Sequence, residues 1–236
     1  MDFLAIVLTI LIGVFSGAFA AASQDKPKDH LVRGIYMISW GAPPFLVALI
    51  LQFVFSYHWG IFPSTQMADP SLGVPRTVTG IISLDALLTG DYSFFISWAE
   101  HAVLPVVALA LISFGIVTRI MRSSMLATLR TDYIRTARMK GIGDTKAIYK
   151  HALKNSLIPV ITIISLVFAY LIAGSIIIEQ IFGYEGMGYL ITQSVYLFDY
   201  PTLIGCTIVV TISVVIINFI ADVAYALVDP RIRLGQ

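Results

Sequence analysis

Residues 132–155 read Asp132-Tyr-Ile-Arg-Thr-Ala-Arg-Met-Lys-Gly141, then Ile142-Gly-Asp-Thr-Lys-Ala-Ile-Tyr-Lys-His151 and Ala152-Leu-Lys-Asn155. They belong to a polar island, 119–155, which lies between two long apolar runs and holds nine of the fifteen Lys and Arg residues of the chain. Lys and Arg concentrate in the cytoplasmic loops of membrane proteins. The island therefore predicts a cytoplasmic loop with membrane spans before and after it.

The composition also predicts a membrane protein. Hydrophobic residues make up 58% of the chain and charged residues 12%, against roughly 45–50% and about 25% in soluble domains. A helix crosses the hydrocarbon core with about 20 residues, and continuous apolar runs favour helices over a barrel of alternating strands. We expect an all-α, polytopic helical membrane protein with one transmembrane domain over residues 1–236. The five apolar runs long enough to span are 3–22, 35–55, 102–121, 157–178 and 202–225.

The positive charges predict which loops are cytoplasmic. Fourteen of the fifteen Lys and Arg residues fall on one side of the five spans, and Arg76 alone falls on the other. Since Lys and Arg in short loops stay on the cytoplasmic side, we expect 119–156 to be a cytoplasmic loop and 56–101 an extracytoplasmic loop. The N-terminus is then extracytoplasmic, and the C-terminus, with Arg231 and Arg233, is cytoplasmic.

Three smaller features carry expectations of their own. The spacing of Gly13 and Gly17 predicts a close approach between two helices. Within loop 56–101, the apolar pieces 81–88 and 94–98 are too short to span, so we expect interfacial or gate-covering segments. Cys206 is the single cysteine and the four histidines are scattered, which argues against a disulfide, a metal-thiolate cluster or a histidine metal site.

Local signals in the island predict two short helices joined by glycines. Asp132 is placed to cap a helix over 133–140, Gly141 and Gly143 to end it, and Asp144 to cap a second helix that runs toward Pro159. The small side chains of Thr136 and Ala137 allow a partner to approach the first helix closely. Two interpretations stay open at this point: a helix that docks on another protein, or a solvated connector whose charge only sets the topology.

The residues themselves resemble a known loop. Arg135-Thr-Ala137, followed after three residues by Gly141, resembles the EAA loop of binding-protein-dependent ABC importer permeases. Residues 132–142 and 151–159 look like the dipeptide, oligopeptide and nickel branch of that family. Further motifs fall in the order of that family: Leu104-Pro105, Arg122-Ser-Ser-Met125, Gly174-Ser-Ile-Ile-Ile-Glu179, Ile181-Phe-Gly-Tyr-Glu-Gly-Met-Gly188, Asp199-Tyr-Pro201, Asn218 with Asp222, and Asp229-Pro-Arg-Ile-Arg233.

The chain departs from the family pattern at several positions. Arg135 stands where the general loop has Glu, and Lys154 stands where it has Pro; both are usual in the peptide branch. Glu185 replaces the Pro of a Phe-Gly-x-Pro-Gly pattern, which leaves the shape of that turn open. The family pattern begins with one more transmembrane helix and an extracytoplasmic segment, so we expect this chain to start at the second family helix, with five spans where six are usual.

The resemblance implies the fold of a type I ABC importer permease and a role in ATP-driven import across the cell (inner or plasma) membrane. It implies a pathway subunit without enzymatic activity, cofactor, metal or nucleic-acid partner. The implied partners are a second homologous permease, two ABC ATPase subunits and an extracytoplasmic substrate-binding protein. The chain has no Gly-x-x-x-x-Gly-Lys-Ser/Thr motif, which agrees with ATP being bound by a separate chain. The residues assigned to ATPase coupling are Tyr133, Arg135, Thr136, Ala137, Arg138, Lys140 and Gly141.

Polar residues in or beside the spans are candidates for the translocation path, because ionisable groups in a bilayer usually face an interior or a cavity. Glu179 ends the fourth span, and Asn218 and Asp222 share one helical face. An alternative role for Asp222 is structural, as a carboxylate that is ion-paired or hydrated near the cytoplasmic boundary. Two other function classes stay open, a stand-alone secondary transporter or channel and an intramembrane enzyme, and so does the substrate: peptides, nickel chelates or sugars.

Overall fold

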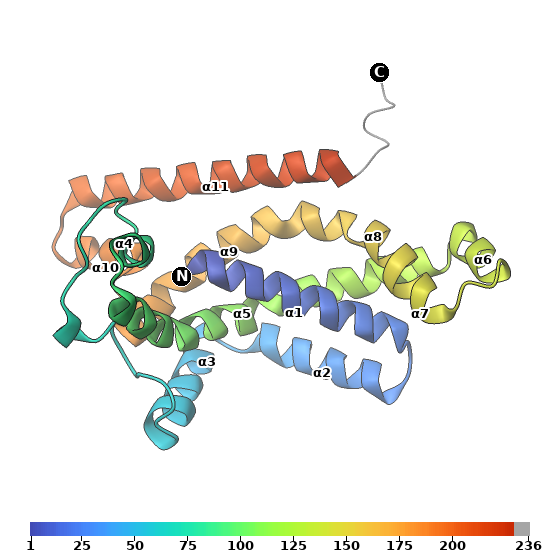
Figure 1. The fold of residues 1–236 in the computed structure, drawn as a ribbon, viewed down its shortest axis with the longest axis horizontal. Helices are drawn as coiled ribbons and strands as arrows, with labels where there is room; N and C mark the ends of the chain where they lie inside the picture. Colours follow the sequence, from blue (N-terminus) through green and yellow to red (C-terminus); the bar gives the residue numbers. More distant parts are fainter. Residues whose placement is uncertain (229–236) are drawn as a thin grey trace. The chain divides into compact units, whose positions relative to one another are not determined.

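The computed structural model describes residues 1–228, except for the side chains of Ser165, Ala173 and residues 224–228. All regular elements in this part of the chain are helical, which confirms the all-α prediction. The motif at 229–233, with Arg231 and Arg233, lies outside the described residues. In chain order (Figure 1) the elements are α1 Asp2–Ala22, α2 Pro27–Gly41, α3 Pro44–Leu51, η1 Gln52–His58, η2 Pro70–Leu72, α4 Ile82–Thr89, α5 Tyr92–Leu129, α6 Asp132–Met139, α7 Asp144–Lys146, η3 Ala147–Ala152, α8 Leu153–Ser156, α9 Ile158–Phe182, α10 Met187–Tyr196 and α11 Tyr200–Val228.

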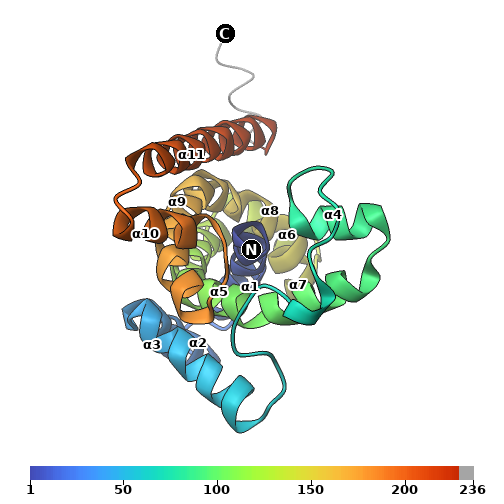
Figure 2. The ribbon, with the colours of Figure 1, turned by 90° about the vertical axis from the view of Figure 1, so that its left-hand side faces the viewer.

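The chain divides into two compact units, and the long helices contribute to both. Unit 1 comprises Met1–Ala5, Pro43–Leu109 and Ile172–Thr207. It contains α3, α4 and α10, and Figure 2 views the chain from the side on which these helices and the N-terminus lie. Unit 2 comprises Ile6–Ala42, Ala110–Leu171 and the chain from Ile208 onward, and it contains α2 and α6 to α8.

Three helices, α1, α5 and α11, are long and apolar enough to cross a membrane, and the described residues reach five spans if each of two bent helix pairs counts as one. The prediction of about five spans matches the upper number. The predicted span 35–55 differs, because α2 ends at Gly41 and α3 begins at Pro44. Ala42 and Pro43 have ψ angles of 134°, the extended conformation that a following proline imposes on the residue before it. Two successive prolines therefore interrupt this apolar run.

The helix α5 is longer than the predicted span 102–121. It contains 38 residues and is about 57 Å long at 1.5 Å per residue. The piece 94–98 forms its first turns and is not a separate short segment, which corrects that prediction. The piece 81–88 is a separate short helix, α4, and the carboxylate of Asp85 holds its start by accepting hydrogen bonds from Thr79 N, Thr79 Oγ1 and Gly80 N.

The predicted close approach at Gly13 and Gly17 is confirmed in unit 2, where α1 packs on α5 (Figure 1). A Cβ atom on Gly13 would lie 2.5 Å from Val117 Cβ, and one on Gly17 would lie 2.7 Å from the Thr118 carbonyl oxygen. Between the two glycines, the hydroxyl groups of Ser16 and Thr118 are 2.8 Å apart. Small residues in this position let helix backbones pack closely where lipid supplies no hydrophobic driving force.

Candidate functional site

The helix α6 lies in the basic island and ends in a well-defined turn. Gly141 has φ +82°, and its N–H donates to the Arg138 carbonyl over 2.9 Å. The N–H of Ile142 donates to the Ala137 carbonyl over 3.2 Å. This pair of bonds is a Schellman motif, in which a residue in the left-handed conformation ends the helix and satisfies its last carbonyls. The predicted helix end at Gly141 is confirmed.

The start of each island helix differs from the prediction by one position. Thr131 occupies the N-cap position of α6 and makes no side-chain capping bond, while Asp132 is the first helical residue. Gly143 occupies the N-cap position before Asp144 in the same way. The two Asp side chains therefore lie in the first turns, where a negative charge favours the positive end of the helix dipole, and they do not cap.

Three features hold α6 in place within unit 2, and two of them are contacts with the segment that follows it. Ile134 is fully buried. The Tyr133 hydroxyl accepts a hydrogen bond from Asn155 Nδ2 over 2.8 Å. Arg138 Nε lies 3.0 Å from Asp144 Oδ1, in an ion pair that is exposed on both sides. One apolar anchor and two surface contacts thus hold the helix.

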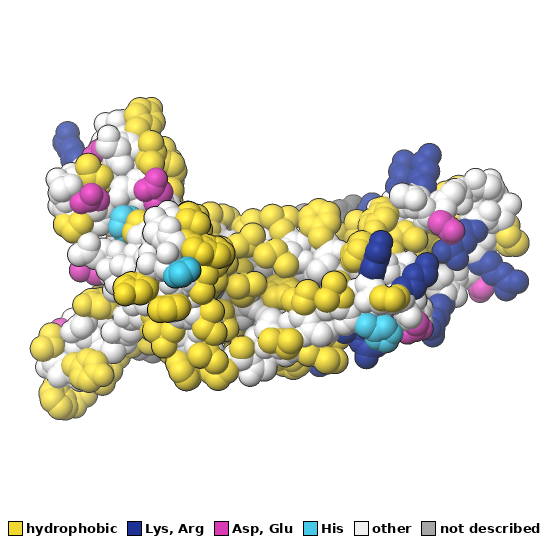
Figure 3. Space-filling view, turned by 90° about the horizontal axis from the view of Figure 1, so that it is seen from below, with side chains coloured by type: hydrophobic (Ala, Val, Ile, Leu, Met, Phe, Trp, Pro, Cys, Tyr) yellow, Lys and Arg dark blue, Asp and Glu magenta, His cyan; other side chains and the backbone are white. Residues whose placement is uncertain are grey.

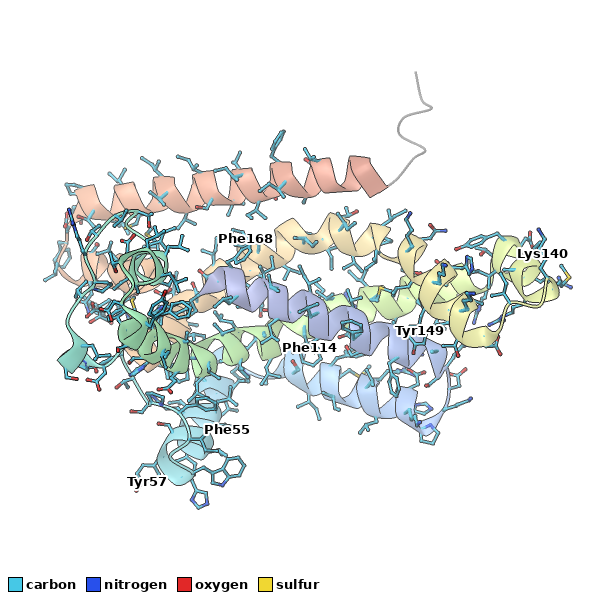
Figure 4. All side chains as sticks on the ribbon, in the orientation of Figure 1. Phe55, Tyr57, Phe114, Lys140, Tyr149 and Phe168 are labelled. Carbon is cyan, nitrogen blue, oxygen red and sulfur yellow. The ribbon has the colours of Figure 1, made fainter. Side chains whose placement is uncertain are left out.

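The remaining side chains of α6 form an exposed surface. Arg135, Thr136 and Lys140 are exposed, and Ala137 is half-buried on the side of Ile134. Met139 is 72% exposed, which is unusual for a large apolar side chain at the centre of a charged loop. Figure 3 shows Lys and Arg side chains gathered over this part of the chain, and Figure 4 shows Lys140 beside α6 and Tyr149 on η3. The sequence prediction did not include Met139, although its position three residues after Thr136 places it on the same helical face as that residue.

A buried ion pair in unit 2 joins α2 to α5. Arg122 Nε donates to Asp29 Oδ1 over 2.7 Å, and Arg122 Nη2 donates to Asp29 Oδ2 over 2.6 Å. This bidentate geometry is the strongest form of a carboxylate–guanidinium contact, and the Asp29 side chain is fully buried. The pair holds the stretch of α5 that leads to α6. The sequence prediction counted Arg122 among the basic residues but did not consider Asp29 as its partner, because 93 positions separate the two.

Of the three predicted path residues, Glu179 is buried, with 3% of its surface exposed. Its Oε2 accepts a hydrogen bond from Tyr189 N over 2.7 Å, near the start of α10. A Cβ atom on Gly186 would lie 2.4 Å from Glu179 Oε1. Glu179 therefore joins the end of α9 to the start of α10 within unit 1.

Asn218 and Asp222 lie on α11 and are exposed in this single chain. Only 6% of the apolar stretch of α11 is buried. The structure places these two residues on one helical face, four positions apart, as their spacing predicts. Glu179 belongs to the other unit.

The turn after α9 has a defined shape despite Glu185. Gly183 has φ +55°, and Tyr184 N donates to the Glu179 carbonyl over 2.9 Å. Trp98 Nε1 donates to the Tyr184 hydroxyl over 2.8 Å. Burial raises the pKa of this hydroxyl to about 12, so it stays protonated at neutral pH. Trp98 and Tyr184 thereby link the start of α5 to the turn.

In the described part of the chain, no three His, Cys, Asp or Glu side chains lie close enough to hold a metal ion. His101, at the start of the third predicted span, contacts the Ser97 carbonyl through Nδ1 at 2.8 Å. It is engaged with its own helix as a hydrogen-bonding group.

Comparison with known families and proteins gives consistent matches. The family model of the binding-protein-dependent transport system inner membrane component matches residues 10–234. A probable D,D-dipeptide transport system permease protein of Escherichia coli (strain K12) is 37% identical over 235 residues, which cover the whole of this chain and 69% of that protein. A dipeptide transport system permease protein of Alkalihalophilus pseudofirmus is 37% identical over 97% of this chain and 68% of its own length.

A solved structure also matches the fold. A chain of the MetNI methionine ABC transporter, in an inward-facing conformation, aligns with a TM-score of 0.71 over 97% of this chain and 91% of its own length. The two sequences are 14% identical, so the likeness concerns the fold. The fold is therefore that of a type I ABC importer permease.

Proposed function

Because this chain belongs to the family of binding-protein-dependent transport system inner membrane components, we propose that it conducts peptides, with dipeptides as the first candidates. The chain is a permease subunit of an ABC importer and not an enzyme. The observation that carries the substrate proposal is the similarity, at 33–37% identity over 97% of this chain or more, to permeases named for dipeptide transport.

The proposed partners are a second homologous permease, two ATPase subunits and an extracytoplasmic binding protein. We place the loop 119–156 in the cytoplasm and 56–101 outside, with the N-terminus extracytoplasmic and the C-terminus cytoplasmic, because the positive charges favour that orientation. The exposed face of α11 that carries Asn218 and Asp222 is assigned to the path, since polar groups in a bilayer turn toward a cavity or another protein. Glu179 is assigned a supporting role at the α9–α10 junction.

The helix α6 is assigned to the contact with an ATPase subunit. Its exposed face offers one apolar side chain, Met139, beside three cationic or polar ones, Arg135, Thr136 and Lys140. The surface of the ATPase subunit that fits this face is an apolar groove with an acidic rim. No observation favours a stand-alone channel, which has no use for such a helix.

The route from α6 into the membrane is short. Tyr133 contacts Asn155 on α8, and only Leu157 separates α8 from α9. On the other side, α5 ends two residues before α6 begins. A rigid-body movement of α6 is therefore passed to two membrane helices, which is how a packed helix transmits motion.

The test is substitution of Ala137, which is half-buried beside the docking face. We expect Ala137→Glu to abolish co-purification with the ATPase subunits and ATP-driven uptake of a labelled dipeptide into vesicles. An unpaired charge buried in the interface costs on the order of several kcal/mol, and the substitution lies outside every span, so membrane insertion is unchanged.

The control is Lys146→Gln, an exposed change on α7 that keeps uptake. If Ala137→Glu assembles and transports as this control does, the coupling assignment is wrong. Competition with unlabelled dipeptide, a nickel chelate and a sugar tests the substrate separately. Competition by the chelate or the sugar alone contradicts the peptide proposal and leaves the coupling assignment untouched.

A further inference from the structure

A groove of about 220 Å³ opens on the surface of unit 2, where α2, α5 and α9 meet. Six of its seven lining side chains are apolar or aromatic, and one is a serine. The lining residues are Trp40, Ile112, Ser113, Ile116, Leu166, Val167 and Tyr170.

The floor of the groove is fixed by close helix packing. A Cβ atom on Gly115 would lie 2.9 Å from the Tyr36 carbonyl oxygen, so glycine is what lets α2 lie against α5 here. The Ser39 hydroxyl donates to the Leu111 carbonyl across the same contact. Ile112 and Val167 are each 2% exposed, whereas Leu166 at the rim is 67% exposed. The groove is thus a preformed hollow, open on one side.

With the third span predicted over residues 102–121, we place the groove at hydrocarbon depth in one leaflet. Ile112 and Ile116 precede residue 121, the end of the predicted third span, by about 8–14 Å along α5 at 1.5 Å per residue. The hydrocarbon core is about 30 Å thick, so this depth corresponds to a single leaflet, the one next to the basic island.

The cationic side chain of Arg119 lies at the end of the groove where a lipid headgroup would be. The guanidinium of Arg119, two residues before the end of the predicted span, lies 4.8 Å from the centre of the Trp40 ring. Arg119 is exposed and forms no ion pair within the described residues. Trp and Arg are the side chains that favour the membrane interface, since each joins an apolar body to a polar tip.

We propose that the groove binds one acyl chain of an anionic phospholipid, with the lipid phosphate held by Arg119. A volume of 220 Å³ has room for about seven methylene-sized groups, if each takes roughly the 30 Å³ of a water molecule. A guanidinium binds phosphate with two parallel hydrogen bonds. The apolar hollow and the cation are arranged along α5 in the order that a phospholipid presents its chain and its headgroup. This proposal does not depend on the transported substrate.

The assembled importer in lipid nanodiscs allows a direct measurement, because Trp40 forms one wall and bromine on an acyl chain quenches tryptophan fluorescence on contact. The contribution of Trp40 is the difference between the unchanged chain and Trp40→Phe. We expect phosphatidylglycerol brominated on its chains, as a minor component in phosphatidylcholine, to be enriched at Trp40 about fivefold over its mole fraction, from the attraction of one arginine for an anionic lipid.

Arg119→Gln is expected to remove this enrichment while phosphatidylcholine still quenches Trp40, and Arg119→Lys to keep part of it. Lys146→Gln, which removes a cation far along the chain on α7, leaves the enrichment unchanged. Equal quenching by both brominated lipids, or enrichment that survives Arg119→Gln, overturns recognition of the phosphate. Absence of quenching by either lipid means that another subunit covers the groove, and this overturns the proposal as a whole.

Discussion

The turn at Gly141 and the α9–α10 junction at Gly186 and Gly188 both require glycine, but for different reasons. Gly141 has φ +82°, and a Cβ atom there would meet nothing within 4 Å. Gly186 and Gly188 have ordinary φ angles, but Cβ atoms there would lie 2.4 Å from Glu179 Oε1 and 2.6 Å from Ile176 Cα. The first position is restricted by backbone conformation and the other two by volume.

The two regions also differ in what holds them. The α6 helix is attached by one buried side chain, an exposed hydrogen bond and an exposed ion pair. At the junction, a buried carboxylate accepts a backbone N–H and fills the space beside a glycine. Elements that dock and move are drawn from the less stable parts of a structure. The lighter attachment of α6 is what its proposed role in coupling requires, whereas the contacts at the junction are those of a fixed joint.

The largest expected effect is at Gly188. Gly188→Ala is predicted to destabilise the purified chain by about 3 kcal/mol, the upper end for overpacking, because the backbone of α9 must shift. The measurement is thermal melting in detergent. Gly205→Ala on α11 is the matched control, since nothing lies within 4 Å of its Cβ position; there the better helix propensity of Ala stabilises by about 0.5–1 kcal/mol. Equal melting shifts for the two variants refute the volume argument.

A smaller effect on stability is expected at Gly141. Gly141→Val places a β-branched residue in the left-handed region, which costs about 1–2 kcal/mol, and distorts the end of α6. We expect uptake to be abolished while membrane insertion is retained. Gly141→Asn, which tolerates this conformation, is expected to keep most of the uptake. If Val and Asn behave alike, the requirement at Gly141 is not one of backbone conformation.

The smallest effect is expected for the Arg138–Asp144 ion pair. Arg138→Gln is predicted to lower stability by about 0.2–1 kcal/mol, because both partners are solvated. The loss is expected to shrink as salt is raised, since salt screens exposed charges. A double-mutant cycle with Asp144→Asn isolates the pair. A coupling that is large and insensitive to salt shows that the α6 segment is held as firmly as the junction and removes the contrast between the two regions.

Several local features were predictable from the sequence alone. Continuous apolar length and loop charge predicted a multi-pass helical protein, because the cost of exposing backbone polar groups to lipid leaves few alternatives. The close approach at Gly13 and Gly17 and the helix end at Gly141 followed from local glycine chemistry. The interruption at Ala42 and Pro43 was predictable in principle, since the conformational effect of proline on its preceding residue is local, but the length of the apolar run concealed it.

Contacts between distant parts of the chain were decided only by the tertiary structure. Asp29 and Arg122 are 93 positions apart, and the groove is assembled from α2, α5 and α9. The role of Glu179 depends on the absence of a side chain at Gly186. The physical reason is that periodicity, charge and turn chemistry act through neighbours along the chain, whereas burial, ion pairing and steric exclusion depend on which helix faces meet. The sequence alone determined the membrane-spanning class, the basic loop and the glycine-ended helix within that loop. Packing determined which polar residues of the chain are buried, paired or left exposed.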